Sequence, residues 1–136
     1  MNKRTLSFAF AIGLMLAVPC SFAAGNVSQE IATAAAHAQM AAAAADKATA
    51  DMHLHHVINC LVGSGDRRYD AQAGDPCKGM GNGALHDLGH APAEHVRLQQ
   101  ALLQTERGLR ANSLDTTHAA AKLAAEALKA SGPNND

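Results

Sequence analysis

Aromatic residues are scarce in this chain of 136 residues, which has no tryptophan, one tyrosine and three phenylalanines. The three phenylalanines all lie near the N-terminus: Phe8, Phe10 and Phe22. Tyr69 is therefore the only aromatic side chain beyond residue 23. A helical bundle that ligates haem iron through a pair such as Met52 and His118 has no aromatic side chain here to pack against the porphyrin. This scarcity disfavours a b-type haem electron carrier, which stays as an alternative.

Cysteines are also few. The chain has three of them, no C-x-x-C pair and no C-x-x-C-H haem-attachment motif, which argues against covalently bound c-type haem. Beyond residue 23 only Cys60 and Cys77 remain. Two cysteines in an exported chain predict a disulfide, which would stabilise a loop of this length by about 3 kcal/mol. The alternative is that both thiols ligate a metal ion.

Motifs that carry catalysis are missing. The glutamates are Glu30, Glu94, Glu106 and Glu126, and none has a histidine three positions on, as di-iron bundles require. The chain shows no Ser-His-Asp order, phosphate-binding loop or dinucleotide fingerprint. Without Lys3 and Arg4, the chain has nine basic and twelve acidic residues. This slight excess of negative charge disfavours a nucleic-acid partner. We therefore expect a protein that is not an enzyme.

The N-terminal segment reads as a secretory signal peptide, residues 1–23. Lys3 and Arg4 precede an apolar run over residues 6–18, and Ser21 and Ala23 place small residues before a cleavage point. The run is too short to span a membrane comfortably. We expect a periplasmic protein without a membrane span after cleavage, consisting of a single helical domain over residues 24–136.

Helical patterns fill most of this domain. The first covers residue 26 to about residue 45, with alanines at spacings of three and four and Ser28 as a possible cap. Large apolar residues from Leu54 to Leu61 then occupy a different face, so the helix either continues or breaks between residues 46 and 51. Thr49 or Asp51 would cap a new helix after a break.

A Gly-rich loop over residues 63–83 follows, and the expected Cys60–Cys77 bridge would hold most of it in place. A short helix at residues 84–90 and two longer ones at 92–110 and 114–130 come next, with Pro92 in a first turn and Ser131, Gly132 and Pro133 ending the last. The expected fold is all-α: a small up-down four-helix bundle, or paired helical hairpins, with a disulfide-tethered loop.

Histidines and methionines supply the candidate metal ligands. His53 and His56 share a face of one helix, and His86 and His90 would share a face of the short helix, four residues apart. Because the tethered loop joins these two segments, the principal site is predicted to combine both pairs. His55 points elsewhere. The remaining candidates are Met52, Met80, His95 and His118; for His37 and Met40, ligation and simple exposure stay equally open.

The last third of the chain carries a resemblance. The stretch 94–130, with Gly108 and Leu109 before a short turn and an Ala-rich helix bearing His118, is similar to small exported metal-binding proteins built from His-bearing, Ala-rich antiparallel helices. That resemblance implies a helical bundle that binds divalent ions, copper among them. The chain departs from that family by lacking dense repeated histidines and by adding the Cys60–Cys77 loop.

Eight histidines and three methionines beyond residue 23 are borderline and soft ligands suited to copper, nickel or zinc. The pattern favours a periplasmic protein that buffers, sequesters or delivers one of these metals, with a metal exporter or a sensor as a possible protein partner. The alternative is a structural or stress-related helical protein in which the histidines are incidental.

Overall fold

The computed structural model describes residues 25–129, so the expected signal peptide and the expected stop after residue 130 lie outside the described residues. Within this range the chain is all-helical and has no strand. The five helices are α1 Val27–Ala43, α2 Lys47–Val62, α3 Ala84–Asp87, α4 Pro92–Arg110 and α5 Leu114–Lys129. The predicted all-α fold with a disulfide-tethered loop is confirmed.

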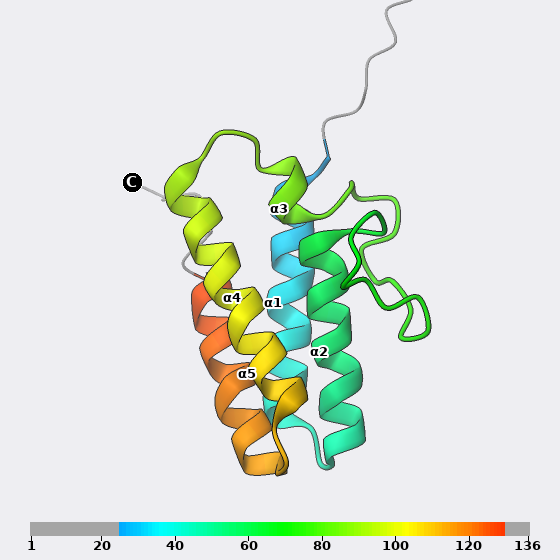
Figure 1. Cartoon of the computed structure of the whole chain (residues 1–136), viewed down its shortest axis with the longest axis vertical. Coiled ribbons are helices and arrows are strands. Elements are labelled where there is room, and N and C mark those ends of the chain that lie inside the picture. The colour runs from blue at the N-terminus through cyan, green and yellow to red at the C-terminus, as the bar shows by residue number, and fades with distance from the viewer. Residues whose placement is uncertain (1–24, 130–136) are drawn as a thin grey trace, which may run out of the picture.

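The four long helices form an up-down bundle (Figure 1). Helices α1 and α2 make one antiparallel hairpin, and α4 and α5 make the other. The hairpins meet along α1 against α5 and α2 against α4. The short α3 lies at the end of the bundle where α1 begins and α2 ends, and it contacts both of them as well as α4.

Capping side chains decide where the first two helices begin. The Asn26 side chain accepts a hydrogen bond from the Gln29 backbone N–H at 3.1 Å, so Asn26, and not Ser28, caps α1. The chain breaks after Ala43, and Asp46 caps α2 by accepting hydrogen bonds from the Thr49 N–H at 2.8 Å and hydroxyl at 2.9 Å. The expected caps Thr49 and Asp51 were wrong, because Asp46 already provides the carboxylate where the chain turns.

Small side chains let the helices approach closely. Seven alanines of the bundle are fully buried: Ala34, Ala38, Ala41, Ala50, Ala101, Ala121 and Ala124. A Cβ atom at Gly108 of α4 would lie 2.6 Å from Leu54 Cδ1 of α2, so glycine permits this contact. Large aliphatic residues, including Leu54, Leu61 and Leu98, fill the remaining space.

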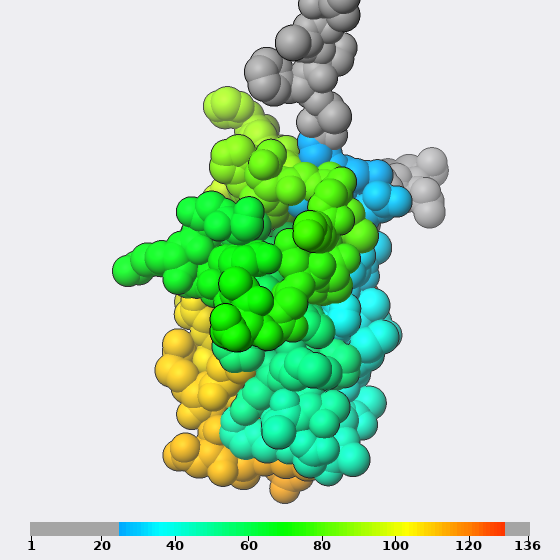
Figure 2. Space-filling model, turned by 90° about the vertical axis from the view of Figure 1, so that its right-hand side faces the viewer, coloured from blue at the N-terminus to red at the C-terminus, as the bar shows by residue number. Residues whose placement is uncertain are grey.

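The loop between α2 and α3 is closed at its base and cross-linked. Gly63 ends α2 with a φ of 70°, and a Cβ atom there would overlap the Asn82 carbonyl. The predicted disulfide joins Cys60 to Cys77, with a Cα–Cα distance of 5.3 Å. The loop lies over the C-terminal end of α2, next to α3. It leaves uncovered the half of α2 that is nearer the α1–α2 turn (Figure 2).

The short helix is shorter than predicted. It ends at Asp87 with Leu88 as its C-cap, and Gly89 then adopts a φ of 62°. His90 therefore lies beyond the helix, and the expected helical pair of His86 and His90 was wrong. Pro92 begins α4, as predicted. Across residues 25–129, no helix combines the length and the apolar character needed to cross a membrane.

Two leucines on α4 provide a matched test of this core. Leu98 is fully buried, whereas Leu103 is 51% exposed. Leu98→Ala should lower the free energy of unfolding by about 2–5 kcal/mol because it leaves a cavity, and Leu103→Ala should change it by less than about 0.5 kcal/mol. Urea denaturation measures both. Equal losses in the two variants would contradict the packing described here.

Candidate metal centre

Three histidines from the first hairpin meet on one side of the α1–α2 contact. His53 and His56 are three residues apart in α2 and therefore share a face. His37 and His53 each lie eight positions from Ala45, in the turn between the antiparallel helices, so the register places His37 of α1 opposite the pair. All three side chains are partly buried.

The ring nitrogens are close enough to share one ion. His37 Nδ1 lies 3.1 Å from His53 Nδ1 and 3.3 Å from His56 Nδ1. Each ring offers one nitrogen as a metal ligand, and these three nitrogens all lie within 4.8 Å of one another. With Zn–N bonds of about 2.0–2.1 Å, the nitrogens of a tetrahedral site are about 3.3–3.4 Å apart. The cluster is thus near metal-binding dimensions.

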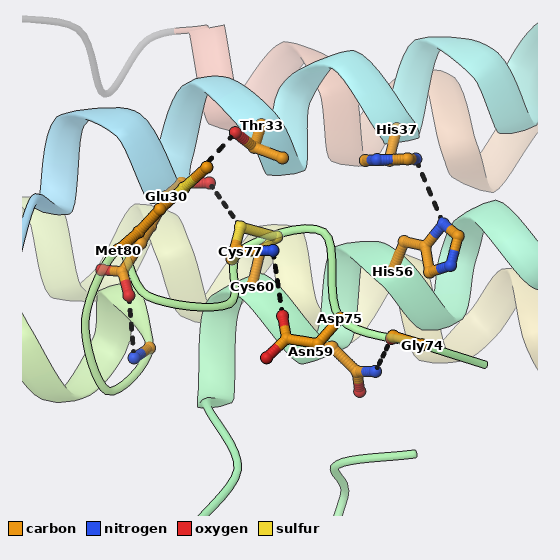
Figure 3. Close-up of a disulfide and its surroundings, with 11 residues drawn as sticks. Glu30, Thr33, His37, His56, Asn59, Cys60, Gly74, Asp75, Cys77 and Met80 are labelled. Carbon is orange, nitrogen blue, oxygen red and sulfur yellow. Dashed lines mark hydrogen bonds between the residues drawn. A yellow bond between two sulfur atoms is a disulfide. The ribbon is translucent and has the colours of Figure 1, made fainter. Parts of the chain in front are cut away.

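The tautomer of His56 is set by the loop. Its Nε2 lies 2.7 Å from the Ala73 carbonyl oxygen, which can only accept, so Nε2 carries the proton. The lone pair of His56 is then on Nδ1, the atom that faces His37 (Figure 3). A backbone carbonyl that holds one imidazole nitrogen is the usual partner of a metal-ligating histidine.

Burial keeps His37 and His53 of this cluster neutral. Burial, followed by the charges of His56 and His53, lowers the pKa of His37 from an ordinary 6.5 to about 4. The pKa of His53 is also lowered, first by burial and then by His56. Metal ions require unprotonated imidazole nitrogens, so both rings are in the binding form at neutral pH.

The other histidines predicted as ligands lie elsewhere. His86 is on α3, its side chain is 74% exposed, and its Nδ1 is 3.0 Å from Asp87 Oδ1. His90 is exposed and follows α3. Among the described residues, neither belongs to a group of three side chains able to hold an ion. His55 was expected to point away from its neighbours, and its Nδ1 lies 3.2 Å from Asp70 Oδ2.

The remaining candidates make other contacts. His118 Nε2 donates to the Ala44 carbonyl at 2.9 Å, at the end of α1, and His95 is partly buried near the start of α4. Met52 is beside His53 in sequence and is 42% exposed. The Met80 sulfur accepts a hydrogen bond from the Thr33 hydroxyl at 3.8 Å, nearer the start of α1 than the histidines (Figure 3).

His37 is the member of the cluster that the sequence left open. Its detection required the position of the α1–α2 break, since a turn centred on Ala45 pairs positions 37 and 53. Comparison of the chain with protein-family models, curated proteins and solved structures found no match. The geometry of the cluster therefore carries the functional argument.

The lowered pKa of His37 predicts a pH-dependent stability for the metal-free protein. Between about pH 6.5 and the folded pKa of about 4, His37 is protonated in the unfolded chain but stays neutral in the folded protein. The free energy of unfolding should therefore fall as the pH drops through this window. His37→Gln should lose part of this dependence, and His90→Gln, at an exposed position, should keep it.

Urea denaturation at about pH 7.5 and about pH 5 compares the three proteins across most of that window. If the free energy of unfolding of wild type falls between these two pH values by no more than that of His37→Gln, the assignment of a buried, neutral His37 is contradicted.

Proposed function

We propose that this protein is a periplasmic metal-binding protein that buffers, sequesters or delivers copper, nickel or zinc through His37, His53 and His56. The observation that carries the proposal is the convergence of three imidazole nitrogens across the α1–α2 contact. The periplasmic location rests on the signal-peptide pattern of residues 1–23.

The donor set favours borderline divalent ions. Imidazole nitrogens suit zinc, copper(II) and nickel(II), whereas an iron–sulfur or tetrathiolate site needs thiolates. Cys60 and Cys77 are bonded to each other and offer none. A proton on His37 Nδ1 can make a well-aligned hydrogen bond to only one of its two neighbours, whereas a metal ion can bind all three nitrogens at once.

The surroundings suit reversible binding. Three protein ligands leave at least one coordination position of the ion for water or for a donor from another protein. The rings are partly buried rather than enclosed, and the bundle has its own apolar core and a disulfide. Folding thus has no need of the ion, and transfer to an exporter or a sensor would occur through the open position.

Calorimetric titration of zinc(II), copper(II) and nickel(II) into metal-free protein tests the proposal. Wild type should bind one ion tightly, and His37→Ala, His53→Ala and His56→Ala should each weaken that event by about tenfold or more, because each removes a ligand. His55→Ala is the matched control, since His55 neighbours His56 in sequence but contacts Asp70 instead.

His86→Ala and His90→Ala complete the series, because the sequence pattern placed these residues in the site. They should leave the tightest event unchanged. Absence of any tight binding by wild type, or a tight event that survives all three cluster substitutions, would refute the proposed site.

A further inference from the structure

One segment of the loop holds the His56 ring from outside. Residues 70–77 pass beside α2, and the Ala73 carbonyl in this segment accepts the Nε2–H of His56 at 2.7 Å. Gly74, next in the chain, has a φ of 88°, and a Cβ atom there would lie 3.9 Å from His56 Nε2. The backbone of this segment is therefore in direct contact with the metal-site ring.

Asn59 of α2 clamps the same segment. Its Nδ2 donates to the Asp70 carbonyl at 2.8 Å and to the Gly74 carbonyl at 2.6 Å, while its Oδ1 accepts from the Asp70 N–H at 2.8 Å (Figure 3 shows the Gly74 contact). The side chain is 1% exposed. A buried amide with both groups satisfied fixes its partners in place, and here those partners flank Ala73.

The disulfide anchors the far end of the segment. Cys60 follows Asn59 directly, and its bond to Cys77 lies against α1, where Cys77 Sγ is 3.9 Å from the Glu30 carbonyl oxygen. Asp75 accepts the Cys77 N–H at 2.9 Å. Consecutive residues of α2, one turn beyond His56, thus hold both ends of the segment that contacts its ring.

We propose that Asn59 and the Cys60–Cys77 disulfide are positioning groups for the metal centre, and that reduction of the disulfide weakens metal binding. They hold the Ala73 carbonyl on His56 Nε2, which keeps the ring plane and the Nδ1 lone pair directed at His37. This inference rests on the proposed function and adds redox control to it.

The reductant is a dithiol. Two electrons and two protons pass from it to the protein, the Sγ–Sγ bond breaks, Cys60 and Cys77 become thiols, and the dithiol becomes a disulfide. The segment then loses one of its two anchors. The ring of His56 is freer to rotate and to carry its proton on Nδ1, the nitrogen that the metal requires.

Two variants separate positioning from loss of structure. Asn59→Ala removes the clamp and keeps the disulfide, and the double variant Cys60→Ser with Cys77→Ser removes the cross-link without adding thiol ligands. Thr117→Val is the matched control, because Thr117 is equally buried but its hydroxyl bonds Gly108 and Ser113 near the α4–α5 turn. Zinc affinity should fall about tenfold to a hundredfold in the first two and stay at the wild-type value in the control.

The second readout needs no metal. Nitrogen-15 NMR of the imidazoles in metal-free protein should show His56 as the Nε2–H tautomer in wild type and in Thr117→Val. Asn59→Ala, the double variant and dithiol-reduced wild type should show a mixture of tautomers. Only a change in positioning, and not lower stability alone, predicts this spectrum.

The outcomes distinguish the two proposals. Wild-type zinc affinity and a single His56 tautomer in both Asn59→Ala and the double variant would overturn the positioning role and leave the proposed function standing. If wild type itself fails to bind zinc, the proposed function falls, while the tautomer spectra of the metal-free proteins still decide whether Asn59 and the disulfide position His56.

Discussion

The turn at residues 44–46 sets the register of α1 against α2, and the rest of the candidate site depends on that register. Ala44 is extended, with a ψ of 142°, and the Asp46 carboxylate starts α2 at once, so the reversal is short. The buried alanines of α1 then let the two backbones approach closely. This register brings together His37, His53 and His56, which lie eight to eleven positions from Ala45 in the turn.

Stability and the proposed metal binding are divided between different parts of the molecule. The aliphatic core lies between the four long helices, and the histidines occupy a partly buried edge of one hairpin. The disulfide contributes about 3 kcal/mol by restricting the unfolded chain, and it also fixes the segment that contacts His56. The proposed release of metal on reduction follows from this double role.

Periodicity and cysteine count were sufficient to predict the bundle, because apolar spacing decides helical faces and the two cysteines beyond residue 23 have one pairing. They were insufficient for the site. His37 lay off the apolar stripe, and its partners depended on a turn that a run of alanines conceals. The pairing of His86 with His90 assumed a helix that continues to His90. In the structure this helix ends at Asp87, before Gly89. Side chains that meet only through the packing register of two helices leave little pattern in the local sequence.

An anomalous-difference map from crystals grown with zinc, recorded on either side of the zinc absorption edge, tests the central claim most directly. The account predicts one strong peak between α1 and α2, about 2.0–2.1 Å from one ring nitrogen each of His37, His53 and His56, with the His56 ligand being Nδ1. A peak at His86 and His90 with none at the cluster, or ligation through His56 Nε2 with the Ala73 contact broken, would contradict it.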